Sequence, residues 1–172
     1  NLATVVQKEI NALLNDGVNK IILVTHLQDL AEDKALITQL HGVDIPAELV
    51  PLAIDEFPAL FVAAACAQGR TLLTGAEELR VKESDRIQVM ADGLQALGIH
   101  AQPTPDGMVI EGGSLRAGTV DSGGDHRIAM SFAMAALRAS GPIEILDCAN
   151  VATSFPGFVD LARGAGLGVS EQ

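Results

Sequence analysis

ALFVAAACAQG (residues 59–69) and IAMSFAMAALRASG (residues 128–141) decide the fold, because both are apolar on nearly every side and both end in glycine. A helix that is apolar all round is buried inside its domain. Each stretch is followed directly by an apolar run typical of a strand, TLLTG (71–75) in the first case and IEILD (143–147) in the second. The two stretches predict an α/β fold in which buried helices alternate with strands.

A two-fold internal repeat extends outward from these stretches. In the first copy, RIQVMADGLQALG (86–98) predicts a second helix, and HAQPTPDGMVIEGG (100–113) predicts two short strands around the turn PDG. In the second copy, NVATSFPGF (150–158) leads into the helix FVDLARGAG (158–166). Each copy resembles a β-α-β-α-β-β unit, and such copies stack around a shared core. We therefore predict a domain of two such units over residues 45–172.

Residues 1–44 have a different texture and predict a helix, a strand and a helix. VVQKEINALL (5–14) has helical apolar spacing, and KIILVTH (20–26) is a β-branched run typical of a buried strand. DLAEDKALITQLHG (29–42) is again helical and ends at glycine. The sequence therefore predicts a helix-strand-helix segment over residues 1–44 that lies outside the repeat.

The composition limits the classes of function. The 172 residues are 48% hydrophobic, which is enough to form a buried core. A net charge of −11 argues against nucleic acid and anionic membranes as partners. We expect a cytoplasmic protein, since no apolar stretch is long enough to span a membrane. Cys66 and Cys148 lack metal-site spacing, and no nucleotide-binding glycine pattern occurs, so we expect no metal and no cofactor.

Charged residues stand where the predicted helices begin. RVKESDR (80–86) contains two residues that can cap the following helix, which leaves Lys82, Glu83 and Arg86 without a structural role. Cations have the wrong sign for a helix N-terminus unless an anion occupies that end. The alternative is a surface ion pair between lysine and glutamate, which contributes little.

The other two helix starts are also charged. Asp125 is a plausible N-cap, and Arg127 lies in the first turn after it, whereas a histidine such as His126 is more often structural than catalytic. Asp55 stands three residues before Pro58 and could simply complement the helix dipole.

Two carboxylates and three cations from these helix starts suit proton transfer on an anionic substrate, without a nucleophile or a cofactor. The residues themselves therefore indicate acid–base chemistry on a substrate that carries phosphate or carboxylate groups. The set comprises Asp55, Glu83, Lys82, Arg86 and Arg127.

Several stretches closely resemble the C-terminal part of the 5-enolpyruvylshikimate-3-phosphate (EPSP) synthase family, in the family's own order. The resemblance implies an enolpyruvyl transferase-like domain whose buried helices point their N-termini at a substrate cleft. It also implies the transfer of the enolpyruvyl group from phosphoenolpyruvate to shikimate 3-phosphate with release of phosphate, a step of aromatic amino acid biosynthesis. The stretches are IDEFPALFVAAACAQG (54–69), AEELRVKESDRIQVMADGLQALG (76–98), GDHRIAMSFAMAAL (124–137) and NVATSFPGF (150–158).

The resemblance also implies roles for individual residues. Asp55 would bind the shikimate hydroxyls and act as the candidate general base, Lys82 would lie at the substrates, and Glu83 would move the proton at the enolpyruvyl methylene. Two arginines would hold phosphoenolpyruvate, with a histidine beside it. The implied substrate-binding residues are Asp55, Lys82, Arg86, His126 and Arg127.

The chain departs from the family in two ways. The N-terminal half that grips shikimate 3-phosphate has no counterpart, and orientation across a cleft can supply about 7–11 kcal/mol, so we expect a fragment with little or no activity alone. Self-association and a complementing N-terminal half both remain open as partners. GVNKIILVTHLQDLAEDKALITQLHGVD (17–44) instead resembles 5′-nucleotidase-type metallophosphoesterases, which predicts a chimera, although a divergent synthase segment is the alternative.

Two other functions compete with this interpretation. The chain could be a non-catalytic folded scaffold or chimera in which residues 1–44 complete the core. A metallophosphoesterase fragment is the weaker candidate, because His26 alone cannot form a dinuclear metal site.

Overall fold

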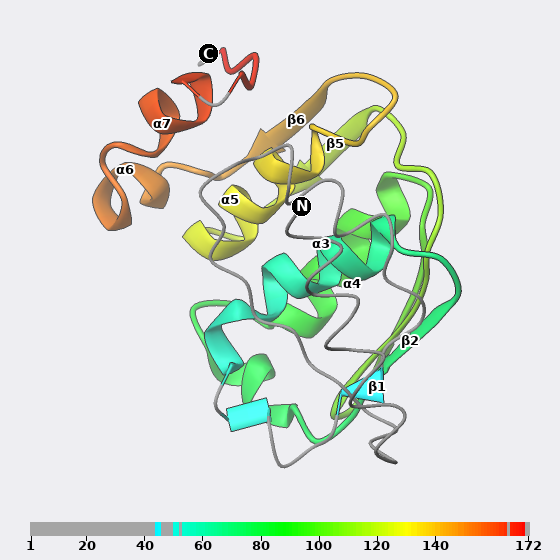
Figure 1. Ribbon diagram of the computed structural model, residues 1–172. Helices are drawn as coiled ribbons and strands as arrows, with labels where there is room; N and C mark the ends of the chain where they lie inside the picture. The colour runs from blue at the N-terminus through cyan, green and yellow to red at the C-terminus, as the bar shows by residue number, and fades with distance from the viewer. Residues whose placement is uncertain (1–43, 46–49, 52, 165, 171–172) are drawn as a thin grey trace, which may run out of the picture.

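The computed structural model describes residues 44–45, 50–51, 53–164 and 166–170 (Figure 1). The helix, strand and helix predicted within residues 1–44 lie outside the described residues.

The larger sheet contains four strands in the order β1-β2-β4-β3. The outer pair β1 and β2 is parallel, and helix α3 (Phe57–Cys66) makes the crossover that a parallel pair requires. The other neighbours are antiparallel, and Thr104 pairs with Gly107 across the β3–β4 turn, which confirms the predicted hairpin. The strands are β1 (Asp44–Ile45), β2 (Arg70–Leu73), β3 (His100–Thr104) and β4 (Gly107–Glu111).

A second sheet pairs β5 (Gly118–Asp121) with β6 (Ile143–Leu146) in parallel, and α5 (His126–Ala135) connects them. The strand predicted at IEILD is therefore confirmed. Sequence patterning did not single out β5, because only Val120 in this four-residue strand is buried. Helix α5 ends earlier than its apolar sequence predicts, since the chain tightens into three-residue turns after Ala135.

The remaining helices flank these sheets. Helix α4 lies against the four-stranded sheet and beside α3, whereas α6 and α7 lie to one side of the body (Figure 1). Within the described ranges, no helix combines the length and the apolar character needed to cross a membrane. These elements are η2 (Ile54–Glu56), η3 (Glu77–Val81), α4 (Arg86–Ala96), α6 (Asn150–Ser154) and α7 (Phe158–Gly164).

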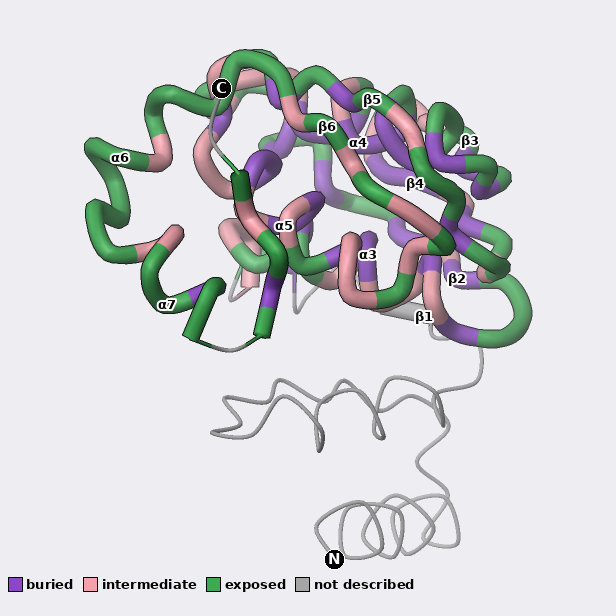
Figure 2. Tube along the Cα trace, turned by 90° about the horizontal axis from the view of Figure 1, so that it is seen from above, coloured by how far each residue is buried: buried purple, intermediate pink, exposed green. Residues whose placement is uncertain are grey.

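Each of the two central helices buries one stripe rather than its whole circumference, which corrects the prediction made from their apolar sequences. In α3 the buried side chains include Phe57 and Phe61, whereas Ala59 is exposed. In α5 Phe132 is fully buried, but 37% of Met134 is exposed. Figure 2 shows buried residues concentrated where α3, α4 and α5 meet the strands. The described neighbours thus cover one side of each helix.

Helices α4 and α5 approach closely at Gly93. A Cβ atom added there would lie 2.3 Å from Cζ of Phe132, whereas nothing lies within 4 Å of a Cβ added at Gly164 of α7. We expect Gly93→Ala to lower the free energy of unfolding by about 1–3 kcal/mol, since overpacking outweighs the gain in helix propensity. Gly164→Ala, the matched control, should raise it by up to about 1 kcal/mol.

Chemical denaturation of the two variants and the parent measures both effects. Equal stabilisation by the two alanines would contradict the packing that the structure shows at Gly93.

Candidate active site

Arg86, the first residue of α4, is fully buried and is surrounded by carboxylates. Its Nε donates to Asp125 Oδ2 at 2.7 Å, its Nη1 to Asp55 Oδ1 at 3.0 Å and its Nη2 to Glu83 Oε2 at 2.5 Å. Burial lowers the pKa of Arg86, but the hydrogen bonds to Asp125 and Asp55 and the charge of Glu83 outweigh this effect and raise it. The guanidinium therefore stays charged inside the protein.

Asp125 links the starts of two helices. Its side chain is fully buried, and Oδ1 accepts a hydrogen bond from the backbone N–H of Arg127 at 2.9 Å, which makes it the N-cap of α5. Oδ2 accepts from Arg86 and from Ser84 Oγ, the latter at 3.2 Å. The predicted cap is confirmed, and the same carboxylate also fixes the arginine at the start of α4.

Asp55 lies in η2, directly before α3, and gathers cations from the other two helix starts. Lys82 Nζ is 3.8 Å from Oδ1, and Arg127 Nη2 is 3.7 Å from Oδ2. Arg127 Nη1 also donates to the backbone oxygen of Asp55 at 3.1 Å. Partial burial raises the pKa of Asp55, but the hydrogen bond from Arg86 and the neighbouring positive charges hold this pKa below its ordinary value.

The structure brings five of the six predicted site residues together. His126 begins α5 and is half-buried, but among the described residues no hydrogen bond or ion pair joins its side chain to the others. We use the name charged cluster for three cations and three carboxylates: Lys82, Arg86, Arg127, Asp55, Glu83 and Asp125.

Two contacts near the cluster were not predicted from the sequence. Lys82 Nζ pairs with Glu78 Oε1 at 2.7 Å, one helical turn earlier. Arg80, which lies in the quoted stretch RVKESDR, reaches the β3–β4 turn, where its Nε donates to the carbonyl oxygen of Pro105 at 2.8 Å. The first contact follows the i,i+4 spacing, which could have revealed it. No local pattern could have revealed the second, because it joins residues 25 positions apart.

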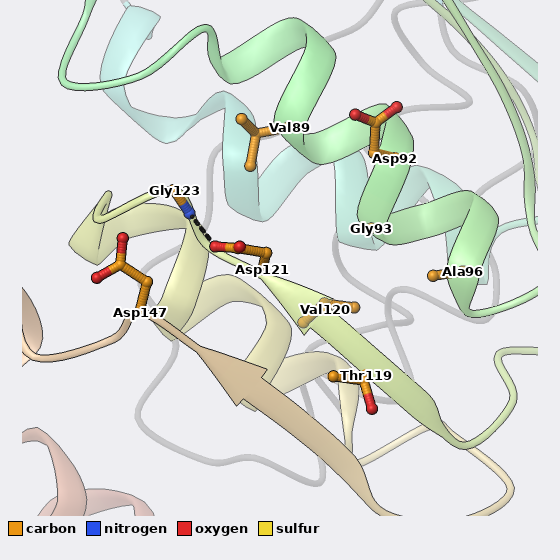
Figure 3. A pocket seen from close by; sticks show the side chains of 9 residues that line it. All are labelled: Val89, Asp92, Gly93, Ala96, Thr119, Val120, Asp121, Gly123 and Asp147. Atoms are coloured by element: carbon orange, nitrogen blue, oxygen red, sulfur yellow. Dashed lines mark hydrogen bonds between the residues drawn. The ribbon is translucent and has the colours of Figure 1, made fainter.

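A separate open hollow of about 540 Å³ lies between α4 and the β5–β6 sheet (Figure 3). Asp92 on α4, Asp121 at the end of β5 and Asp147 after β6 line it, and among the described residues no lysine or arginine does. None of the predicted site residues contributes to it. Its negative lining would repel a phosphorylated ligand, so the charged cluster is the better candidate for an anionic substrate.

Among the residues that the structure describes, no group of three or more histidine, cysteine, aspartate or glutamate side chains is arranged to hold a metal ion.

The chain is thus an α/β domain whose helix starts bring cations together, and comparison with known proteins shows its family. Residues 5–161 match the family model described as EPSP synthase (3-phosphoshikimate 1-carboxyvinyltransferase), and the chain therefore belongs to this family. It is 74% identical over 132 residues to the 3-phosphoshikimate 1-carboxyvinyltransferase of Nitrosococcus oceani, covering 77% of this chain and 30% of the relative. The corresponding protein of Methylococcus capsulatus is 76% identical over 131 residues, which cover 76% of this chain and 30% of that relative.

The solved structures include the EPSP synthase of Acinetobacter baumannii. It superposes with a TM-score of 0.72 at 61% sequence identity, over 74% of this chain and 31% of that one. The chain thus spans about 30% of the length of the relatives that it matches.

The family match bears on the predicted chimera. The match begins at residue 5, inside the segment for which a different origin was predicted, and none of these comparisons gives a sign of a 5′-nucleotidase. The chimera therefore gains no support. A domain boundary after residue 44 stays a prediction.

The depressed pKa of Asp55 predicts a pH dependence of stability. As the pH falls, the unfolded chain takes up this proton first, so the stability that Asp55 contributes is present above its ordinary pKa of 3.8 and is lost as the pH falls through the lower, folded value. Asp55→Asn should therefore flatten the acid limb of the curve of unfolding free energy against pH.

Chemical denaturation between about pH 6 and pH 2.5 measures this slope. Asp160→Asn, at a side chain that is 90% exposed on α7, controls for the loss of one negative charge. Equal acid slopes in the parent and in Asp55→Asn would contradict the prediction.

Proposed function

We propose that the charged cluster binds phosphoenolpyruvate and serves the transfer of its enolpyruvyl group to shikimate 3-phosphate, with release of phosphate. The observation that carries the proposal is the convergence of Lys82, Arg86 and Arg127 on the half-exposed carboxylate of Asp55. Membership of the EPSP synthase family supports this choice of substrates. An enzyme that acts on two anionic substrates must place cations where they meet, and this chain of net charge −11 gathers three there.

Each group in the cluster has a chemical task in this reaction. Asp55 is ionised at neutral pH and can accept a proton from a substrate hydroxyl once the ligand has displaced it from Arg86. Glu83, whose side chain is 50% exposed and lies 2.5 Å from Arg86, would move the proton at the enolpyruvyl methylene. Lys82 and Arg127, both partly exposed, can neutralise the phosphate and carboxylate groups. His126, one position before Arg127, would lie beside the same ligand.

The two exposed carboxylates compete with an incoming anion for Arg86. Asp125 is fully buried and cannot leave Arg86, whereas Asp55 and Glu83 are 46% and 50% exposed and can rotate into solvent. The three cations already face the three carboxylates of the cluster, and Lys82 and Arg127 also pair with Glu78 and Glu56. Phosphoenolpyruvate therefore binds by replacing carboxylate partners of Arg86. The ligand therefore binds in the same step in which the carboxylates of Asp55 and Glu83 leave Arg86.

We also infer that the domain is built from repeated β-α-β-α-β-β units. The described elements β1-α3-β2-α4-β3-β4 follow this order, and β5-α5-β6 begins in the same way with a parallel crossover. A site that is formed by helix starts in this way needs an opposing wall to orient both substrates. Because the chain spans about 30% of its relatives' length, we expect binding without appreciable turnover until a complementary chain or a second copy supplies that wall.

Calorimetric titration with phosphoenolpyruvate, with and without shikimate 3-phosphate, tests the proposed binding. Arg127→Ala should weaken phosphoenolpyruvate binding by about ten-fold or more, since a charge-assisted hydrogen bond contributes about 1.5–3 kcal/mol. Arg116→Ala, which removes an exposed arginine outside the cluster, should bind as the parent does. No binding by a cooperatively folded parent would refute the proposal, and phosphate release by the parent alone would refute the need for an opposing wall.

The substitution Glu83→Gln tests whether this carboxylate competes with the ligand for Arg86, separately from its proposed role in proton transfer. Removing this charge should tighten phosphoenolpyruvate binding by about three- to ten-fold, because a partly exposed ion pair contributes on the order of 1 kcal/mol. The same titration measures it, with Glu144→Gln on the exposed face of β6 as the control for net charge. Weaker binding in Glu83→Gln would show that this carboxylate helps to hold the ligand rather than competing with it.

A further inference from the structure

The turn between β3 and β4 is bonded through Arg80 to the segment that carries Lys82 and Glu83. The Nε of Arg80 donates to the carbonyl oxygen of Pro105 at 2.8 Å, and its Nη2 donates to that of Thr104 at 2.5 Å. The Nη1 of the same guanidinium pairs with Asp85 Oδ2 at 2.6 Å. One planar side chain thus joins the hairpin turn to the start of α4.

A second set of bonds holds the other end of the same segment. Asp106, in the turn, accepts the backbone N–H of Gly75 on Oδ2 at 2.9 Å, and its backbone oxygen accepts the N–H of Ala76 at 2.7 Å. Its other carboxylate oxygen lies 3.2 Å from Thr104 Oγ1. Helix η3 (Glu77–Val81) is therefore bonded to the hairpin turn on both sides, by Asp106 before it and by Arg80 within its last turn.

Packing alone does not fix η3. Leu79 is its one buried residue, and 79% of Val81 is exposed. Lys82 follows immediately, so its position relative to Asp55 depends on where η3 ends. Asp85, the other partner of Arg80, caps α4 by accepting the N–H of Gln88 at 3.0 Å. Because η3 buries so little surface, hydrogen bonds from the β3–β4 turn must fix its position.

We propose that Arg80 and Asp106 are positioning residues, which hold η3 against the β3–β4 turn so that Lys82 and Glu83 reach Asp55 and Arg86. The side-chain hydrogen bonds of Arg80 and Asp106 go to residues outside the charged cluster. Both residues therefore act on the cluster through η3, the segment that they hold. The inference deepens the proposed function and rests on it for the ligand that the cluster binds. It makes a surface hairpin turn part of the machinery that shapes the site.

The experiment compares three variants with a matched control. Arg80→Lys keeps the charge but loses the planar fork that reaches three acceptors, Arg80→Ala removes both, and Asp106→Asn removes the carboxylate beside Gly75. Arg116→Ala is the control for the loss of one exposed arginine. The first readout uses no ligand: the amide resonances of the segment between η3 and α4 and the pH titration of the Asp55 carboxyl carbon, both by NMR.

We expect the amides of Lys82 and Glu83 to shift in all three variants and not in Arg116→Ala. The pKa of Asp55 should rise toward its ordinary value, because Lys82 contributes to lowering it and would move away in these variants. Arg80 itself is not among the charges that lower this pKa, so the rise would report the position of Lys82. Phosphoenolpyruvate binding should weaken by about three- to ten-fold, the range that residues outside a site can produce through coupling. In a Lys82→Ala background, the effect of Arg80→Ala on binding should shrink.

Each outcome decides between the two proposals. If Arg80→Lys and Asp106→Asn fold cooperatively but leave the Lys82 and Glu83 amides and the Asp55 titration unchanged, the positioning role is wrong, whatever the ligand does. If the effects of Arg80→Ala and Lys82→Ala on binding add independently, Arg80 does not act through Lys82, and the inference is again wrong. If the amides and the titration move as expected but the parent chain binds no phosphoenolpyruvate, the positioning role stands and the proposed function fails.

Discussion

The buried ion pair between Arg86 and Asp125 is the constraint on which the rest of the site depends. Both side chains are fully buried, and their atoms lie 2.7 Å apart. Removing one partner of such a pair leaves an uncompensated charge inside the protein, at a cost of about 3–5 kcal/mol. Because Arg86 begins α4 and Asp125 caps α5, the pair also fixes how these two helices start relative to each other.

The third helix start completes the arrangement. Asp55, directly before α3, receives Arg86 from α4 and Arg127 from α5, so three segments far apart in the sequence meet at one carboxylate. The starts of α4 and α5 favour negative charge, and the carboxylates of Asp85 and Asp125 cap them. The cations beside these helix starts add to the attraction for an anion. A protein of net charge −11 thus concentrates three cations at one place, whereas the hollow between α4 and the β5–β6 sheet is lined by three aspartates, which would repel an anion.

Helix packing and site chemistry depend on each other in this chain. Gly93 lets Phe132 lie against α4, so that α4 and α5 approach closely enough to share one buried ion pair. The outer edge of the site is held differently, by hydrogen bonds from the β3–β4 turn to a segment with a single buried residue. Rigid core packing therefore sets Arg86, and a surface hairpin sets Lys82 and Glu83.

The sequence by itself determined the helices α3, α4, α5 and α7, the hairpin and the strand β6, because apolar spacing, the turn PDG and cap residues such as Asp125 are local signals. Cations placed against the helix dipole also identified Lys82 and Arg86 as candidates, and Glu83 remained as a candidate once the cap residues were accounted for. Only the tertiary structure decided that Arg86 bonds to three carboxylates at once, that His126 stays apart, and that Arg80 reaches Pro105. Burial on one stripe of α3 and α5, and the short strand β5, were likewise beyond local patterns. The reason is physical. Apart from the pair Arg86–Glu83, which are three residues apart, these contacts join residues 25 to 39 positions apart, and the type and spacing of neighbouring side chains do not show which distant segments meet.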